Sequence, residues 1–152
     1  MWGLFLSIDK PIIAALHGYV IGSGVEIALL CDLRIASEDV VFGLPEAALG
    51  MLPAAGGTQS LPRAVGASEA VNMLLSNERV NATRALEVGL VHRVVSRDLL
   101  LSEAFTLARQ LAGHPAHLVR AVKEAIRRGM DMPLERALGL ELHLAATATS
   151  AK

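Results

Sequence analysis

The chain shows two patterns of hydrophobic and polar positions, one in each half. In the first half, short apolar runs rich in β-branched residues cover residues 12–16, 33–36 and 40–42. Runs this short predict buried β-strands, because a helix of the same burial needs roughly ten or more residues. Residues 24–31 (GVEIALLC) lie among these strands and are apolar on almost every side, which predicts a helix buried all round whose one charge is Glu26.

From about residue 68 onward the pattern becomes helical, with apolar residues spaced three and four positions apart. Ser68 and Asn81 are typical N-cap residues, so we expect each to begin a helix and Gly89 to end the second one. The pattern predicts these later elements in order: a helix over residues 69–75, a helix over 82–88, a strand over 91–95, and helices over 102–113, over 116–128 and from 134 onward. Strands alternating with helices, followed by helices alone, predict an α/β chain with a helical second half.

Length and composition exclude several classes of protein. The 152 residues suffice for one domain, and 14 Lys and Arg residues against 15 Asp and Glu residues leave a net charge of −1. A chain with this net charge has no positive electrostatic field that would attract it to nucleic acid or to an anionic membrane. None of its apolar runs reaches the roughly 18 residues of a membrane span. The hydrophobic fraction of 53% exceeds the usual value of roughly 45–50%, which predicts a surface covered by a partner.

The single cysteine and the first residues bear on the compartment. Cys31 has no second cysteine with which to form an internal disulfide, and no Cys/His cluster could bind zinc, so we expect a reducing compartment and no metal. The first ten residues lack the basic start and the small-residue cleavage site of a signal peptide. The expected location is cytoplasmic, or the mitochondrial matrix if the source is a eukaryote.

Two carboxylates lie in apolar surroundings that are unusual for surface residues. Glu26 lies within the apolar helix, and Glu46 follows a Leu-Pro pair and precedes two alanines. Burial in such surroundings favours the protonated form of a carboxyl group, which suits proton exchange near neutral pH. The alternative is that both are structural carboxylates, paired with Lys10 or Arg34 or capping a helix.

Residues 22–24 (Gly-Ser-Gly) stand directly before the apolar helix. Small residues there let the N–H groups of a helix N-terminus approach a ligand oxygen, which is the geometry of an oxyanion hole. Two glycines before a helix more often form only a tight turn. The segment matches neither the dinucleotide-binding nor the phosphate-binding glycine motif. Ser23 is not in a nucleophile elbow, because Ile21 stands where that motif needs glycine. A serine acyl hydrolase that uses Ser23 is therefore the weakest functional hypothesis.

Five motifs follow one another between residues 10 and 66: Lys-Pro, Gly-x-Gly-x-Glu, Cys-Asp, Pro-Glu, and Gly-x-x-Pro-x-x-Gly-Gly-Thr-Gln. Their order resembles the enoyl-CoA hydratase/isomerase (crotonase) family. The helices from residue 68 to residue 147 resemble the family's continuation, including Ala-x-x-x-Gly-Leu-Val at residues 85–91. The resemblance implies the crotonase-like α/β fold, a spiral core of short strands and helices followed by a helical region.

The resemblance also implies an acyl-CoA enzyme in which backbone N–H groups hold the acyl carbonyl oxygen while an enolate forms. It places one such N–H group at Ser23, the water-activating carboxylate at Glu26 and the acid that protonates C2 at Glu46. In the family's hydratases these glutamates stand 20 residues apart, as they do here, and retention of both favours a hydratase over an isomerase. The pocket is then expected to include these residues: Gly22, Gly24, Pro45, Gly56 and Gly57.

By this resemblance, residues 1–66 are part of the crotonase core, with the oxyanion loop and both glutamates. Residues 67–152 are the helical part that assembles homotrimers or hexamers. The family's Ala-x-Ala-Asp-x-Lys-like segment, which supplies the second oxyanion N–H group and grips CoA, does not occur among the 152 residues. A non-catalytic assembly module is therefore the main alternative. No cofactor is expected beyond the coenzyme A of the substrate.

Two stripes in the helical half indicate how its surfaces are used. The last helix carries a wide apolar stripe that predicts self-association: Leu134, Leu138, Leu142 and Leu144. The helix before it carries a basic stripe: Arg120, Lys123, Arg127 and Arg128. With a net charge of −1 and 3% aromatic residues, the basic stripe indicates a solvated face or a subunit contact rather than RNA binding.

Overall fold

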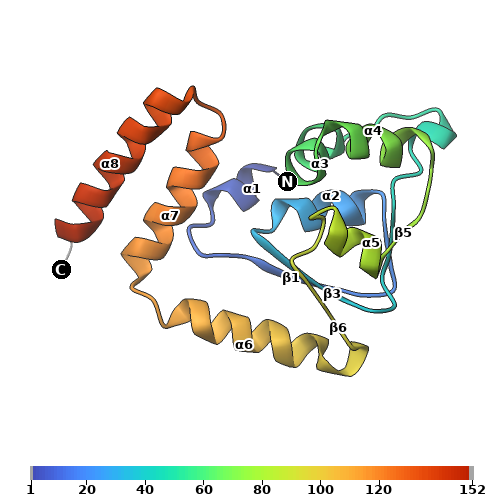
Figure 1. The fold of residues 1–152 in the computed structure, drawn as a ribbon, viewed down its shortest axis with the longest axis horizontal. Coiled ribbons are helices and arrows are strands. Elements are labelled where there is room, and N and C mark those ends of the chain that lie inside the picture. Colours follow the sequence, from blue (N-terminus) through green and yellow to red (C-terminus); the bar gives the residue numbers. More distant parts are fainter. Residues whose placement is uncertain (1, 151–152) are drawn as a thin grey trace.

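The structure of the chain, a computed structural model, describes residues 2–150, whose strands form two small sheets (Figure 1). The first sheet is parallel with the order β1-β3-β6, and its strands are Ile13–Leu16, Leu33–Ser37 and Arg93–Val95. The second has the order β2-β4-β5, and its strands are Tyr19–Ile21, Val41–Gly43 and Val80–Asn81. The strands predicted at residues 12–16, 33–36 and 40–42 are thus confirmed as β1, β3 and β4.

The chain passes from the first sheet to the second twice in the same way, which gives the core a spiral form. β1 continues into β2 and β3 continues into β4, each through a short turn. Gly18, in the first turn, has a φ of 59°, a conformation that glycine adopts without steric cost. Helix α2 (Ser23–Leu30) then carries the chain back, so that β3 pairs beside β1 and β4 beside β2.

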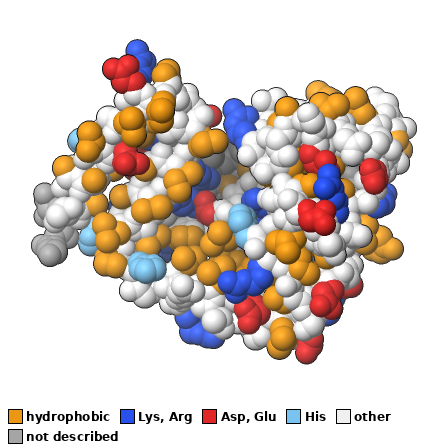
Figure 2. Space-filling model, viewed as in Figure 1, with side chains coloured by type: hydrophobic (Ala, Val, Ile, Leu, Met, Phe, Trp, Pro, Cys, Tyr) orange, Lys and Arg blue, Asp and Glu red, His pale blue; other side chains and the backbone are white. Residues whose placement is uncertain are grey.

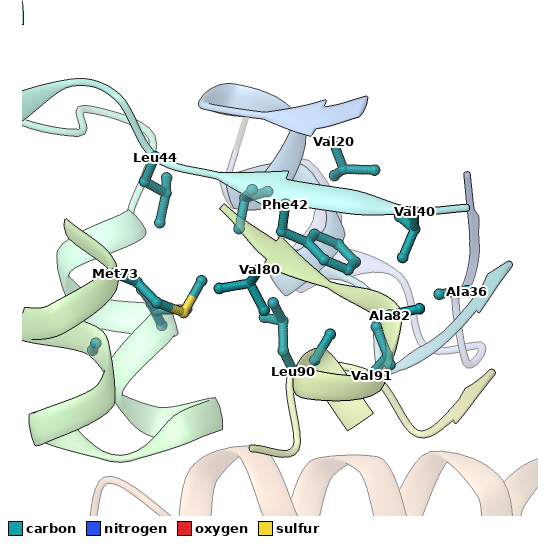
Figure 3. Packing of buried hydrophobic residues seen from close by; sticks show 14 residues of the cluster. Val20, Ala36, Val40, Phe42, Leu44, Met73, Val80, Ala82, Leu90 and Val91 are labelled. Carbon is teal, nitrogen blue, oxygen red and sulfur yellow. The ribbon is translucent and has the colours of Figure 1, made fainter. Parts of the chain in front are cut away.

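A hydrophobic cluster joins both sheets to helices α2 to α5. Helix α3 spans Gly57–Val65, α4 spans Ala67–Leu75 and α5 spans Ala82–Glu87. Phe42 of β4 is fully buried and lies beside Val40, Val80 and Leu90 (Figure 3). Each large apolar side chain buried in this way contributes about 1.5–3 kcal/mol to the stability of the fold. The cluster therefore fixes α2 against the strands, and α2 carries the candidate site.

The later helices lie outside this cluster. Helix α6 (Leu100–Ala112) contacts β1 and β3, whereas α7 (Ala116–Gly129) and α8 (Leu134–Ser150) form a hairpin to one side of the sheets (Figure 1). The remaining elements are α1 (Trp2–Ser7) and the 3-10 helices η1 (Ala47–Leu49) and η2 (Arg97–Leu99). Within residues 2–150, no helix combines the length and the apolarity that a bilayer span requires.

Of the three helix starts predicted at a serine or an asparagine, two are wrong and one is confirmed. Helix α4 begins at Ala67, directly after Gly66, so Ser68 lies inside the helix instead of capping it. Helix α6 begins at Leu100, and the Ser102 hydroxyl donates to a carbonyl within the same turn. Asn81 does cap α5, because its Oδ1 accepts a hydrogen bond from the Arg84 N–H at 2.9 Å.

Candidate active site

The candidate site begins at the N-terminus of α2. Gly22 precedes the helix with φ 56° and ψ −121°, and its N–H donates to the Gly43 carbonyl of β4 at 2.8 Å. Its own carbonyl accepts from the N–H groups of Val25 and Glu26. The hydrogen bonds within residues 2–150 leave the N–H groups of Ser23 and Gly24 without a partner. They carry the positive end of the helix dipole, where an oxyanion is stabilised.

Glu26 is buried one turn further along α2, with an exposed fraction of 1%. Its Oε1 accepts two backbone hydrogen bonds, from the Ala55 N–H at 2.9 Å and from the Gly57 N–H at 2.8 Å. Its Oε2 receives no hydrogen bond from the described residues. Oε1 is therefore held in place, and Oε2 is the oxygen left to exchange a proton.

The loop that holds Glu26 depends on glycine at two positions. Gly56 has a φ of 103°, which side-chain-bearing residues rarely adopt. At Gly57, a Cβ atom would lie 3.0 Å from the Pro53 Cβ and 3.1 Å from the Glu26 Oε1. A side chain at this position would press on Pro53 and Glu26, so glycine eases the close approach of the Gly57 N–H to the carboxylate.

Glu46 approaches the same helix end from the other side. It begins the 3-10 helix η1, and a Cβ atom placed on Gly22 would lie 2.8 Å from its Oε1. Its Oε2 is buried and has no hydrogen-bond partner in the described chain. A buried polar atom without a partner costs about 1–3 kcal/mol, and such atoms in folded proteins call for a specific explanation. A water molecule or a substrate atom at this place would supply the missing bond.

The structure thus brings the two glutamates to one helix end. Glu46 lies against Gly22, and Glu26 follows Gly22 by one helical turn, about 6 Å along the axis. No ion pair joins Glu26 to Lys10 or Arg34 in the described residues, but the helix-capping alternative is observed in part, because Glu26 accepts the N–H of Gly57, the first residue of α3. Arg34 instead donates to the carbonyls of Leu90 and Cys31, at 2.6 and 3.1 Å. Two carboxyl groups converging beside free N–H groups can take one proton and give another while an oxyanion is held.

The structure also places two other predicted pocket residues, Pro45 and Gly24. Pro45 is half-buried directly before Glu46. A Cβ atom on Gly24 would meet its nearest neighbour, a methyl carbon of Val20, at 3.7 Å, so space does not demand glycine there. No sequence pattern predicts that the Ala55 and Gly57 N–H groups bind Glu26, because a backbone donor leaves no mark on residue type.

Neither candidate nucleophile of this region is activated. The Ser23 hydroxyl makes no hydrogen bond to a histidine or a carboxylate of the described residues, so nothing there would remove its proton. Cys31 ends α2 as a buried thiol, and burial raises its pKa, which keeps it in the unreactive protonated form. The site is therefore equipped for proton transfer rather than for covalent catalysis.

Comparisons with known proteins agree on one family. The sequence model described as enoyl-CoA hydratase/isomerase matches residues 1–152. The chain is 44% identical over 144 residues to the 2,3-dehydroadipyl-CoA hydratase of Escherichia coli K12, covering 95% of this chain and 56% of that protein. It is 46% identical over 129 residues to the (E)-benzylidenesuccinyl-CoA hydratase of Thauera aromatica, covering 85% and 50%.

The comparison with solved structures confirms the crotonase-like fold. An enoyl-CoA hydratase from Bacillus anthracis superposes with a TM-score of 0.96 at 36% identity, covering 99% of this chain and 58% of that chain. An enoyl-CoA hydratase subunit from Geobacillus kaustophilus superposes with a TM-score of 0.95 at 38% identity. The chain spans about half the length of the curated relatives it matches.

Proposed function

The chain belongs to the enoyl-CoA hydratase/isomerase family, and we propose that it supplies the acid–base groups of an enoyl-CoA hydratase. One observation supports the proposal: Glu46 lies against Gly22, Glu26 lies one turn along α2, and the Ser23 N–H between them in the sequence has no partner in the described residues. A module used only for assembly gains nothing from the buried, unpaired Oε2 of Glu46, which destabilises the fold.

The proposed reaction adds one water molecule across the 2,3 double bond of an enoyl-CoA. Glu26 Oε2 takes a proton from water, and the water oxygen forms a bond to C3. The electron pair of the double bond moves onto the thioester oxygen, and the Ser23 N–H stabilises the resulting enolate. Glu46 then gives a proton to C2 while the carbonyl re-forms. The step consumes no oxidant or cofactor, and coenzyme A enters as part of the substrate.

Retention of Glu26 beside Glu46 favours hydration over isomerisation. An isomerase moves one proton between two carbons and can use Glu46 alone. Here Glu26 is held by two backbone donors, and a Cβ atom on Gly57 would lie in tight contact with Glu26 and Pro53. Such a rigid placement of one carboxylate oxygen suits a second catalytic group, which a hydratase needs for water.

The family resemblance assigns one oxyanion donor, the Ser23 N–H, to this chain and places the second in a segment outside this stretch of sequence. Loss of one oxyanion donor costs about 10²–10³-fold in rate. We therefore propose that activity requires the family's N-terminal half. The open edges of β1 and β2, which pair on one side only within residues 2–150, are where it would add strands.

The test is hydration of crotonyl-CoA by the chain alone and by the chain fused behind the N-terminal half of the E. coli relative. We expect the chain alone to show weak or undetectable acetoacetyl-CoA binding and little turnover, and the fusion to recover both. Turnover by the chain alone on the order of 10 s⁻¹, a usual enzyme rate, would contradict the proposal. A fusion that isomerises a 3-enoyl-CoA but adds no water would establish the isomerase alternative.

The remaining proposals concern assembly and location. We propose a homotrimer or a dimer of trimers, supported by the exposed apolar side chains of α8. The proposed compartment is the cytoplasm or the mitochondrial matrix; one relative, from Dictyostelium discoideum, is named a probable mitochondrial enoyl-CoA hydratase.

A further inference from the structure

Helices α7 and α8, residues 116–150, form a unit that we call the C-terminal arm. The two helices pack chiefly against each other, and no residue of α7 is fully buried. Figure 2 shows a hollow between the arm and the rest of the molecule, with hydrophobic side chains along it. Two cavities of about 610 and 540 Å³ lie there, between α7, α6 and residues 8–13. Apolar packing therefore contributes little to holding the arm in place.

One buried ion pair joins the arm to the sheets. The Lys123 Nζ of α7 donates to Asp32 Oδ2 at 2.6 Å and to the Lys10 carbonyl at 2.8 Å. The Lys123 side chain is only 8% exposed, so the expectation of a solvated basic stripe is wrong at this position. The same Asp32 oxygen accepts from the Ile12 N–H at 2.8 Å, directly before β1. Asp32 thus connects the arm with the end of α2 and the start of β1.

The other ion pairs between the arm and the body join exposed side chains, and one of them pairs Arg63 of α3 with Asp131 of the arm at 3.6 Å. Arg120 pairs with Asp9 at 3.1 Å, and each side chain is 61% exposed. Arg127 donates to the Phe5 carbonyl at 3.4 Å. Exposed ion pairs contribute little to stability, whereas removing one partner of a buried pair leaves an uncompensated charge at high cost. Lys123 is therefore the contact on which docking of the arm depends most.

We propose that the C-terminal arm opens and closes on the body as a unit, and that the Lys123–Asp32 ion pair keeps it closed. The three residues between α6 and α7, 113–115, provide the hinge, because they are exposed and carry a glycine and a proline. Opening separates α7 from residues 8–13 and exposes both cavities to solvent. The core cluster stays intact, because it contains no residue of the arm.

Hydrogen exchange of the whole chain, followed by mass spectrometry, tests this proposal. In Lys123→Met, which keeps the length of the side chain and removes its charge, we expect amides of α7 and α8 to exchange on the order of 100-fold faster. Amides of β3 and β4 should be unchanged. Arg128→Met is the matched control, because Arg128 pairs with Glu124 on its own helix, and it should change exchange by less than about threefold.

A second variant keeps the test decisive. Asp32→Asn retains an oxygen for the Ile12 N–H and removes the charge, so it should release the arm as Lys123→Met does. In the double variant, the amides of the arm should exchange no faster than they do in either single variant. Unchanged arm amides in Lys123→Met, additive effects in the double variant, or equal acceleration in β3 and β4 would each overturn the proposal. The last result would show that Lys123 supports the whole fold.

Discussion

Two backbone N–H groups decide which oxygen of Glu26 is available for chemistry. Ala55 and Gly57 both donate to Oε1, so Oε2 is the oxygen available for the proposed role as base. The apolar surroundings mark Glu26 and Glu46 as unusual, and the family resemblance assigns them to the site. The sequence does not predict the two donors, since any residue type supplies a backbone N–H, and the preference for glycine at Gly57 follows only from its contact with Pro53.

Replacement of Gly57 tests this arrangement at a single atom. The added methyl group of Gly57→Ala would lie 3.0 Å from Pro53 and 3.1 Å from Glu26 Oε1, so these neighbours must give way by a few tenths of an ångström. We expect the free energy of unfolding, measured by urea denaturation, to fall by about 1–3 kcal/mol. Activity of the fused enzyme should fall as well, because the displaced loop no longer orients Glu26.

Gly139→Ala is the matched control for that substitution. Gly139 lies within α8, and a Cβ atom there would meet nothing within 4 Å. Alanine in an open helix position stabilises by about 0.5–1 kcal/mol relative to glycine. Equal stability changes in the two variants would refute the steric account of Gly57.

The sequence predicts well the helices and strands that show a regular apolar pattern. It does not predict helix boundaries that are set by the backbone conformation of a glycine. The buried helix α2 is confirmed because its apolar residues leave no polar face. Helix α3 is not predicted, since Pro62 lies inside it and proline lacks the N–H that a helix interior uses. Helix α4 begins one residue after Gly66, whose φ of 84° turns the chain without any side-chain cap. Such glycine turns carry no N-cap signature in the sequence.

The junction of β3 and β6 makes stability depend on pH. The backbone N–H of Arg34 donates to the ring Nδ1 of His92 at 2.9 Å. The backbone N–H of His92 donates to the Arg34 carbonyl at 2.9 Å. Burial, and next the nearby Arg34 guanidinium, lower the pKa of His92 below its ordinary value of 6.5. The neutral imidazole stabilises the fold above pH 6.5, and this contribution is lost as the pH falls from 6.5 through the lowered pKa. Urea denaturation across this range should show the loss.

His92→Asn separates this effect from general acid destabilisation. The asparagine Oδ1 can accept the Arg34 N–H but does not titrate in this range. We expect the variant to lose less stability than the wild type as the pH falls below 6.5. If the free energy of unfolding depends on pH identically in the two proteins, His92 does not cause the loss of stability.

At the scale of the whole molecule, large apolar side chains remain exposed on the described chain. On α8 the exposed fractions are 75% for Leu134, 50% for Leu138 and 73% for Leu142, while the predicted fourth member, Leu144, is half-buried. A second exposed group adjoins Glu46 and includes Leu49, Met51 and Leu52. Contiguous apolar surfaces of this kind mark contacts with other chains. The composition already predicts a covered surface, but only the structure shows where it lies.

Sedimentation of the chain at micromolar concentration tests the predicted self-association. We expect a species larger than the monomer, and we expect Leu134→Gln combined with Leu142→Gln to shift it toward the monomer, since both changes remove apolar contact area. The control is Leu144→Gln, which changes a half-buried position and should affect stability more than association. A clean monomer for the wild-type chain would contradict the prediction.

The central claim is that Glu26 and Glu46 act together on one water molecule and one enoyl-CoA. The most direct measurement is the rate of crotonyl-CoA hydration by the fused enzyme carrying Glu26→Gln or Glu46→Gln. Each change keeps the side-chain shape and removes proton transfer, so each should lower the rate by about 10²–10⁴-fold while acetoacetyl-CoA binding is kept. A near-normal rate in either variant would contradict the assignment of that glutamate to the reaction.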